Sequence, residues 1–218
     1  PVLSSAASDV YKRQLKGESR FVLENENARV PIFTFAYFGP DTRGDLEATY
    51  AADVFSFTLQ QKASKLQKEL VESGLALHVD IGYSTLKHTG EIYITLVPNP
   101  QSIKEAYEKL NEQVEQWDDP SYFTDEQMQT GKDMLAIQDA YGKEAPSEYI
   151  HTITYWWASA SLDYYVNYVK NIQAVTRKQI ENYIATYIQG KPRVVGLMLP
   201  AGMKESLDLD SFFKETPR

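Results

Sequence analysis

Two runs of residues in the first half of the chain alternate between apolar side chains and polar or small ones. The apolar members are Leu75, Leu77, Val79 and Ile81 in the first run and Ile92, Ile94 and Leu96 in the second. A period of two places alternate side chains on opposite faces of a strand. We therefore expect an antiparallel hairpin in a sheet that is covered on one face only.

Three further strands are expected outside this hairpin. The strings "SRFVLEN" (residues 19–25) and "VPIFTFAYF" (residues 30–38) are rich in β-branched and aromatic residues and flank a polar turn. The string "RVVGLML" (residues 193–199) is apolar throughout apart from its first residue, which is typical of a strand inside a sheet.

Helical signals occupy most of the remaining sequence. A long helix is predicted from near Asp45, with Leu46, Tyr50, Val54 and Phe57 at helical spacing, and a short one over residues 65–72. The expected boundary residues are Ser64 and Gly74 around the short helix, Pro100 at the first position of the next, Thr124 and Tyr141 around a third, and Thr176 and Gly190 around the last. Between the last two, the stretch after Pro146 predicts two helices that meet near Ser161.

The resulting order, β-β-α-β-β-α-α-α-α-α-β, predicts an α+β fold with a mostly antiparallel sheet and helices packed mainly on one face. With 218 residues, 43% of them hydrophobic and 24% charged, the chain has an ordinary globular composition. We expect one domain over residues 15–200 and a polar tail over residues 201–218.

The first fourteen residues are treated separately. The string "DVYKRQ" is what GAT GTG TAT AAG AGA CAG encodes, a sequence that resembles a transposase adapter used in sequencing libraries. We expect residues 1–14 to be a non-native, adapter-derived segment of a truncated gene, or otherwise a disordered arm. The segment has no apolar stretch of the kind found in signal peptides.

Charge and composition exclude several classes of function. Lys and Arg number 22 against 30 Asp and Glu, a net charge of −8, which argues against a nucleic-acid partner. The absence of cysteine excludes disulfides and thiolate metal sites. No apolar run reaches the length of a membrane span.

Histidine and acidic residues offer few candidate sites. His78, His88 and Glu91 lie around the predicted hairpin and could form a zinc site, but their spacing matches no metallopeptidase motif. A simpler explanation is that His78 lies on the polar face of the sheet and His88 in the turn. His151 is expected to be packed or partly solvated. The acid pairs Asp53 with Glu47 and Asp118 with Asp119 are more simply explained by helix capping and solvation.

An aromatic segment near residue 155 could also stack on bases or sugars. Its members Tyr149, Ile150, Ile153, Trp156 and Trp157 fall at helical spacing. We therefore expect most of them to lie in the core or between helices, and we assign no catalytic, metal-binding or substrate-binding residue in this chain.

Three strings resemble the second domain of the M16 (insulinase or pitrilysin-like) zinc peptidases. They are "LQQKASKLQKELVESGLA", "FTDEQMQTGKDML" and "YYVNYVKNIQAVTRKQIENYIATYIQGKPRVVGLMLP", and the resemblance extends over about residues 19–200. In that family a first domain binds zinc through an inverted H-x-x-E-H motif, and the second domain lacks the motif. The corresponding helix here, "DLEATYAADVFSFTLQ", contains no histidine.

The resemblance implies the inactive, C-terminal type of M16 domain. It predicts that this chain is not catalytic alone, that zinc belongs to a catalytic partner domain in the same parent chain or a separate subunit, and that an unstructured peptide is the substrate. The family's substrate-binding arginine and tyrosine have Val71 and Leu77 nearest to their places, so no such residue carries over. The alternative is a pseudo-peptidase interaction module without a proteolytic partner. The resemblance also favours a bacterial protein of the periplasm or cell envelope.

Overall fold

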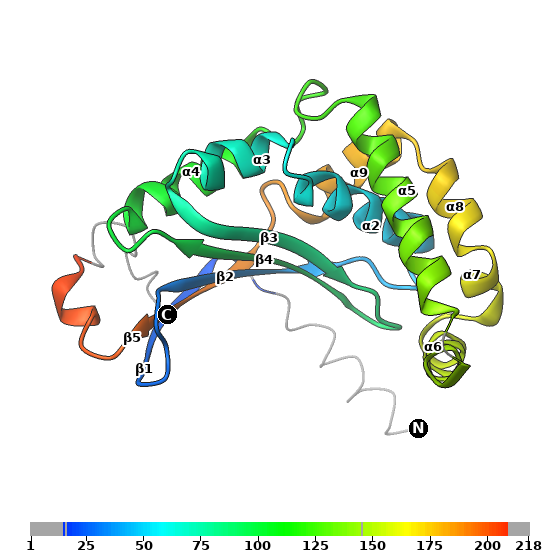
Figure 1. Cartoon of the computed structure of the whole chain (residues 1–218), viewed down its shortest axis with the longest axis horizontal. Helices are drawn as coiled ribbons and strands as arrows, with labels where there is room; N and C mark the ends of the chain where they lie inside the picture. The colour runs from blue at the N-terminus through cyan, green and yellow to red at the C-terminus, as the bar shows by residue number, and fades with distance from the viewer. Residues whose placement is uncertain (1–14, 16, 145, 209–218) are drawn as a thin grey trace.

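A five-stranded sheet with the order β1-β5-β2-β4-β3 forms the base of the molecule (Figure 1). The computed structural model describes residues 15, 17–144 and 146–208. The strands are β1 (Ser19–Asn25), β2 (Ile32–Gly39), β3 (Ala76–Ser84), β4 (Gly90–Pro98) and β5 (Arg193–Pro200). Among the described strands, only β1 and β5 pair in parallel, and the other pairs are antiparallel. The expected mostly antiparallel sheet is confirmed.

The strand nearest the C-terminus lies inside the sheet. β5 pairs with β1 on one side and with β2 on the other. It therefore separates β1 from β2, which are consecutive in the sequence. Val195 and Leu197 of β5 are completely buried. The prediction of an interior strand from the apolar string is therefore confirmed.

The helices lie mainly over one face of this sheet (Figure 1). They are α2 (Leu46–Gln60), α3 (Lys65–Gln67), the π-helix η1 (Lys68–Glu72), α4 (Ile103–Glu115), α5 (Asp125–Gly142), α6 (Pro146–Ser159), α7 (Leu162–Val166), α8 (Tyr168–Ala174), α9 (Arg177–Tyr187) and the 3-10 helix η2 (Lys204–Ser206). α2 packs on β3 and contacts α5 and α9. α6 projects to one side, where α7 is its main neighbour.

Local helix signals agree well with the predicted boundaries. Thr124 and Thr176 each form a complete capping box with the glutamine three residues later. The Ser64 side chain accepts a hydrogen bond from the Gln67 amide, and Gly74 follows the short helical segment with a φ of 82°. A positive φ is accessible to glycine at little cost, which explains why the segment stops there.

The core lies between the sheet and the helices, and an aromatic cluster fills its centre. Phe55 of α2 contacts Trp117, Phe123 and Tyr183, with ring centroids 5.2, 6.2 and 6.1 Å away. These edge-to-face contacts join α2 to α9 and to the segment between α4 and α5. α2 is therefore a central element of the core.

The alternation predicted for β3 is wrong at its start. A register shift lies between Ala76 and His78, so Ala76 is buried whereas Leu77 is 56% exposed. A β-bulge inserts one residue and moves the following side chains to the other face. From Val79 onward the predicted alternation holds.

One helix start and one residue of a predicted buried stripe also differ from the prediction. α4 begins at Ile103 after Ser102, because Pro100 and Gln101 form a turn in which the Asn99 side chain accepts a hydrogen bond from the Gln101 amide. Such a turn satisfies the backbone locally and delays the helix. Leu46, at the start of α2, is exposed rather than part of the buried stripe.

The aromatic segment is less buried and more interrupted than predicted. Ile150 and Trp157 on α6 are 64% and 68% exposed, and His151 is exposed as well. Three helices replace the expected two, because the Asn167 side chain donates hydrogen bonds to the carbonyl and carboxylate of Asp163 and separates α7 from α8. The predictions for residues 1–14 and for 209–218 of the polar tail lie outside the described residues.

Candidate functional site

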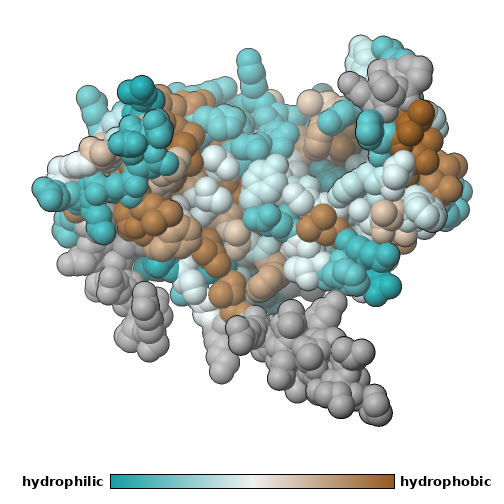
Figure 2. Space-filling model, turned by 90° about the horizontal axis from the view of Figure 1, so that it is seen from below, coloured by the Kyte–Doolittle hydropathy of each residue, from teal (hydrophilic) through white to brown (hydrophobic). Residues whose placement is uncertain are grey.

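The sheet face opposite the helices carries mostly small side chains, together with the rings of Phe21 and Tyr93. Residues of all five strands line up in rows across this face. One row consists of Phe21, Gly196, Thr34, Thr95 and Asp80. The neighbouring row consists of Ser19, Val194, Ala36, Tyr93 and Gly82. The described helices leave this face open, and Figure 2 shows apolar groups exposed among polar ones on it. We refer to it as the open face.

Two glycines allow aromatic rings to lie flat on the open face. A Cβ atom on Gly82 would come within 2.2 Å of the Tyr93 ring, and one on Gly196 within 2.6 Å of the Phe21 ring. The rings therefore occupy the space that side chains at these positions would need. The open face is therefore shallow at these two positions.

The predicted hairpin residues do not converge on a metal site. His78 pairs with Val97 near the start of β3, whereas Glu91 pairs with Ser84 at its other end, about 20 Å away along the strand. His88 lies in the connecting turn, and both histidines are exposed. Across the described residues, no group of three or more His, Asp or Glu side chains is arranged to hold a metal ion.

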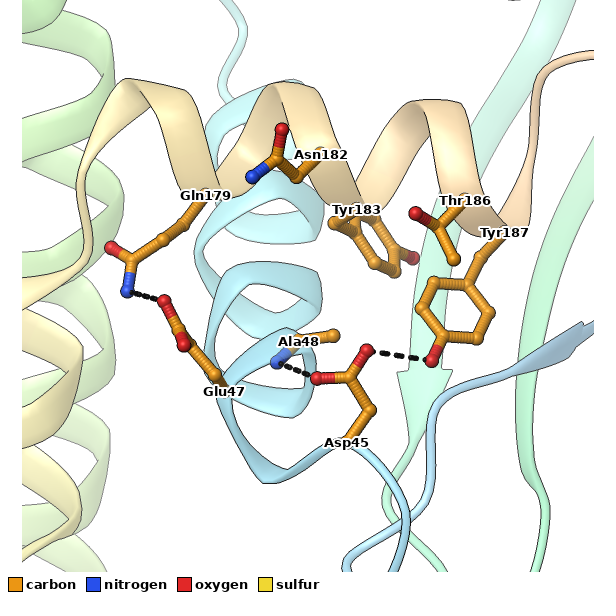
Figure 3. A pocket seen from close by; sticks show the side chains of 8 residues that line it. All are labelled: Asp45, Glu47, Ala48, Gln179, Asn182, Tyr183, Thr186 and Tyr187. Carbon is orange, nitrogen blue, oxygen red and sulfur yellow. Dashed lines mark hydrogen bonds between the residues drawn. The ribbon is translucent and has the colours of Figure 1, made fainter.

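The acids at the start of α2 fasten it to α9 (Figure 3). Asp45 caps α2, accepting a hydrogen bond from the Ala48 amide at 3.1 Å, and accepts another from the Tyr187 hydroxyl at 2.8 Å. Glu47 accepts a hydrogen bond from the Gln179 side chain. The pocket between these residues has a volume of about 150 Å³. Because both acids are already engaged with the protein, we interpret the contacts as structural.

Asp53 lies apart from Glu47, and the two do not form an acid pair. The part-buried carboxylate of Asp53 accepts a hydrogen bond from the Tyr168 hydroxyl at 2.7 Å. Burial raises the pKa of Asp53 to about 7, and the hydrogen bond from Tyr168 opposes that shift only in part. The carboxylate lines a pocket of about 530 Å³, which we call the Asp53 pocket.

Sequence reasoning did not identify the Asp53 pocket. Its lining comes from α2, the end of β3, α5, α6, α7 and α8, with Tyr83, Tyr155, Trp156 and Tyr168 among its aromatic residues. These elements are far apart in the sequence and meet only in the fold. The isolated Gly82 and Gly196 within strands were the available signal for the open face, since glycine in a strand marks a close approach.

The remaining candidate positions have local roles. Asp119 accepts hydrogen bonds from the Ser121 amide and hydroxyl, both at 2.8 Å, which lower the pKa of Asp119 in an exposed turn. Asp118 is exposed beside it. Val71 packs against the core and Leu77 lies in the bulge.

None of the described helices has the length and apolar character needed to cross a bilayer.

Comparison with known proteins gives one family match. A family model described as "Peptidase M16 inactive domain" matches residues 6–135, more than half of the chain. A search of curated protein sequences finds no match.

Solved structures share the fold at low sequence identity. A protease from Helicobacter pylori matches with a TM-score of 0.75 and 17% identity over 86% of this chain and 45% of that one. An inactive peptidase domain from Bordetella parapertussis matches with a TM-score of 0.69 and 15% identity, over 87% of this chain and 94% of that one. The periplasmic protease PqqL from Escherichia coli matches with a TM-score of 0.61 and 11% identity, over 84% of this chain and 21% of that one. The chain thus spans less than half of either protease and nearly all of the single domain.

Proposed function

Because this chain belongs to the M16 peptidase family, in which it matches the inactive domain, we propose that it is the non-catalytic half of a zinc endopeptidase. A catalytic domain with an H-x-x-E-H motif, in the same polypeptide or in a separate subunit, holds an extended peptide. This chain closes over that peptide and excludes water from the reaction. Zinc and the attacking water belong to the catalytic domain.

The open face is the observation that carries this proposal. Its central positions are occupied by Gly196, Thr34, Ala36 and Thr95, which form a shallow surface large enough for an extended peptide. At its margins Phe21, Leu23 and Phe38 are about half exposed, which suits contacts with a second protein surface. A wall of this kind can enclose a chamber only when a second domain faces it.

The residues of α2 do not fit a zinc site. Most of its side chains are buried core residues, and its acids Glu47 and Asp53 each accept a hydrogen bond from another helix. A catalytic zinc needs three firm ligands, usually with histidine among them. Any proteolytic chemistry is therefore assigned to the partner.

The test is a reconstitution with a separately purified M16 catalytic domain. We expect the chain alone to bind no stoichiometric zinc and to leave a quenched, unstructured peptide intact. Adding it to the catalytic domain should increase cleavage, and a chelator should abolish that activity. Stoichiometric zinc with chelator-sensitive cleavage by the chain alone would overturn the proposal.

A pair of variants tests the open face directly. Thr34→Trp places a large ring on the exposed centre of that face, and Glu105→Trp places the same ring on an exposed position of α4. Neither change removes a core contact, so both variants should unfold at the wild-type temperature. Only Thr34→Trp should reduce the cleavage gained on reconstitution. Equal effects of both variants would contradict a role for the open face.

The alternative function is a pseudo-peptidase interaction module. The exposed Ile150 and Trp157 of α6 and Val166 of α7 favour it, since large apolar groups exposed on a surface can bind another protein. Figure 2 shows apolar groups at this end of the molecule. If the catalytic domain binds this chain without gaining activity, the module is the better interpretation.

A periplasmic or cell-envelope location is part of the proposal. Its support is the family resemblance together with the periplasmic protease PqqL among the similar structures. Fractionation of cells that express this protein from its own gene tests the location. Recovery in the cytosolic fraction would contradict it.

A further inference from the structure

The Asp53 pocket combines an aromatic wall with an acidic group and lies apart from the open face's central rows. Tyr83 enters it from the end of β3, Trp156 from α6 and Tyr168 from α8. The Tyr155 hydroxyl donates a hydrogen bond to the Thr85 carbonyl at 2.7 Å, which fastens α6 to the end of β3. At about 530 Å³ the pocket has the volume of sites that bind small organic molecules.

The charges in this pocket are unbalanced. Of its two acids, Asp139 on α5 accepts a hydrogen bond from Lys143. Asp53 accepts a hydrogen bond from the neutral Tyr168 hydroxyl at 2.7 Å, and no Lys, Arg or His among the described residues forms a salt bridge with it. Buried carboxylates are normally paired with a cation or fully hydrogen-bonded. When it is ionised, the Asp53 carboxylate therefore has no cationic partner among the described residues.

The aromatic rings suit an organic cation better than a metal ion. Trp156 stacks on Tyr164 and Tyr168, with centroids 4.9 and 6.5 Å away, so the wall is built of rings in mutual contact. Lys143 already lies 5.3 Å from the ring centroid of Tyr165 in the same pocket. A ring face attracts ammonium groups, whereas Mg²⁺ and Ca²⁺ require several oxygen ligands.

We propose that the Asp53 pocket binds a small alkylammonium ligand, with the ammonium group on the Asp53 carboxylate and the alkyl part against Tyr83, Trp156 and Tyr168. This inference does not depend on the peptidase role, because it concerns a pocket among helices rather than the open face. The ammonium group can come from a free amine or from a lysine side chain, and these sources share the recognition chemistry.

Binding is expected to depend on pH. Burial raises the pKa of Asp53 to about 7, so the carboxylate is mostly protonated at pH 6 and mostly ionised at pH 8. The titratable groups that interact with it are Tyr50, Tyr83, Tyr164, Tyr168 and Tyr183, and burial raises the pKa of each. Asp139 also lines the pocket and accepts a hydrogen bond from Lys143, which lies outside the lining. An alkylammonium ion remains charged over this range. Affinity should therefore rise about tenfold from pH 6 to pH 8.

The experiment is a calorimetric titration of the intact chain with butylammonium, with 1-butanol as the neutral control. We expect saturable binding of butylammonium only. Asp53→Asn should weaken it by about tenfold or more, and Glu47→Gln, which removes an acid of α2 outside the pocket, should leave it unchanged. N-acetyl-lysine amide distinguishes the two sources: binding assigns the pocket to lysine side chains, and exclusion assigns it to free amines.

Three results would overturn the proposal. They are the absence of saturable butylammonium binding to the wild type, equal binding of 1-butanol, and unchanged binding to folded Asp53→Asn. If that variant does not fold, the pH series on the wild type decides instead. An affinity that stays constant between pH 6 and pH 8 would then refute the role of Asp53.

Discussion

Replacing Asp53 with asparagine is expected to stabilise the protein, and to do so more as the pH rises from 5 to 8. Burial raises the pKa of this carboxyl group from 3.8 to about 7 in the folded protein. Between these values the folded protein binds more protons than the unfolded chain. The stability associated with Asp53 is therefore greatest below pH 3.8 and is lost as the pH rises toward 7.

The size of the effect follows from the two pKa values. At pH 5 the carboxyl of the unfolded chain is almost fully ionised, whereas that of the folded protein is not. Each further pH unit up to about 7 then removes about 1.4 kcal/mol from the free energy of unfolding. Between pH 5 and pH 8 the wild type should lose up to about 2.5 kcal/mol through this group. Asparagine cannot ionise, so the variant lacks this loss.

The assay is urea unfolding of both proteins at pH 5, 6, 7 and 8, followed by tryptophan fluorescence. The quantity of interest is the difference in the free energy of unfolding between variant and wild type, because other titrating groups cancel in it. The side-chain amide adds an offset that does not vary with pH. Glu47→Gln controls for the loss of one negative charge from α2. Parallel curves for wild type and Asp53→Asn would refute the reasoning.

Five further changes test the packing and the N-terminal segment. Val195→Asp and Leu197→Asp each place a charge inside the sheet and should cost several kcal/mol, seen as insoluble or non-cooperatively unfolding protein. Thr124→Ala removes a capping box and should cost about 1 kcal/mol in urea unfolding. Lys132→Met removes the ammonium group that donates to the carbonyls at the end of α8 and should cost about 1 to 3 kcal/mol in the same assay. Deleting residues 1–14 should change the free energy of unfolding by less than about 1 kcal/mol, measured by thermal denaturation.

Features that depend on neighbouring residues were predictable from the sequence. The capping boxes at Thr124 and Thr176 each need only a hydroxyl and a glutamine three residues later. The apolar run of β5 predicted an interior strand because few other environments accept consecutive apolar residues. In these cases the determining contacts lie within one turn or one strand.

Features that depend on distant partners were not predictable. The bulge before His78 arises from how β3 pairs with β4, and periodicity within β3 alone does not reveal it. Ile150 and Trp157 have helical spacing, yet spacing shows only which residues share a face and not whether another element covers it. The Asp53 pocket is the extreme case, because six elements contribute to its lining.

The geometry of α2 explains why this helix does not accommodate an inverted zinc-binding motif. An inverted motif with Asp53 as its acid would require histidines three residues before it and one after it, where Tyr50 and Val54 stand. Tyr50 stacks on Tyr164 at 4.9 Å, and Val54 is completely buried. Histidines there would lose core contacts and would face packed helices instead of an open site. The helix that carries zinc ligands in a catalytic half is here part of the core, and the domain's open surface lies on the other side of the sheet.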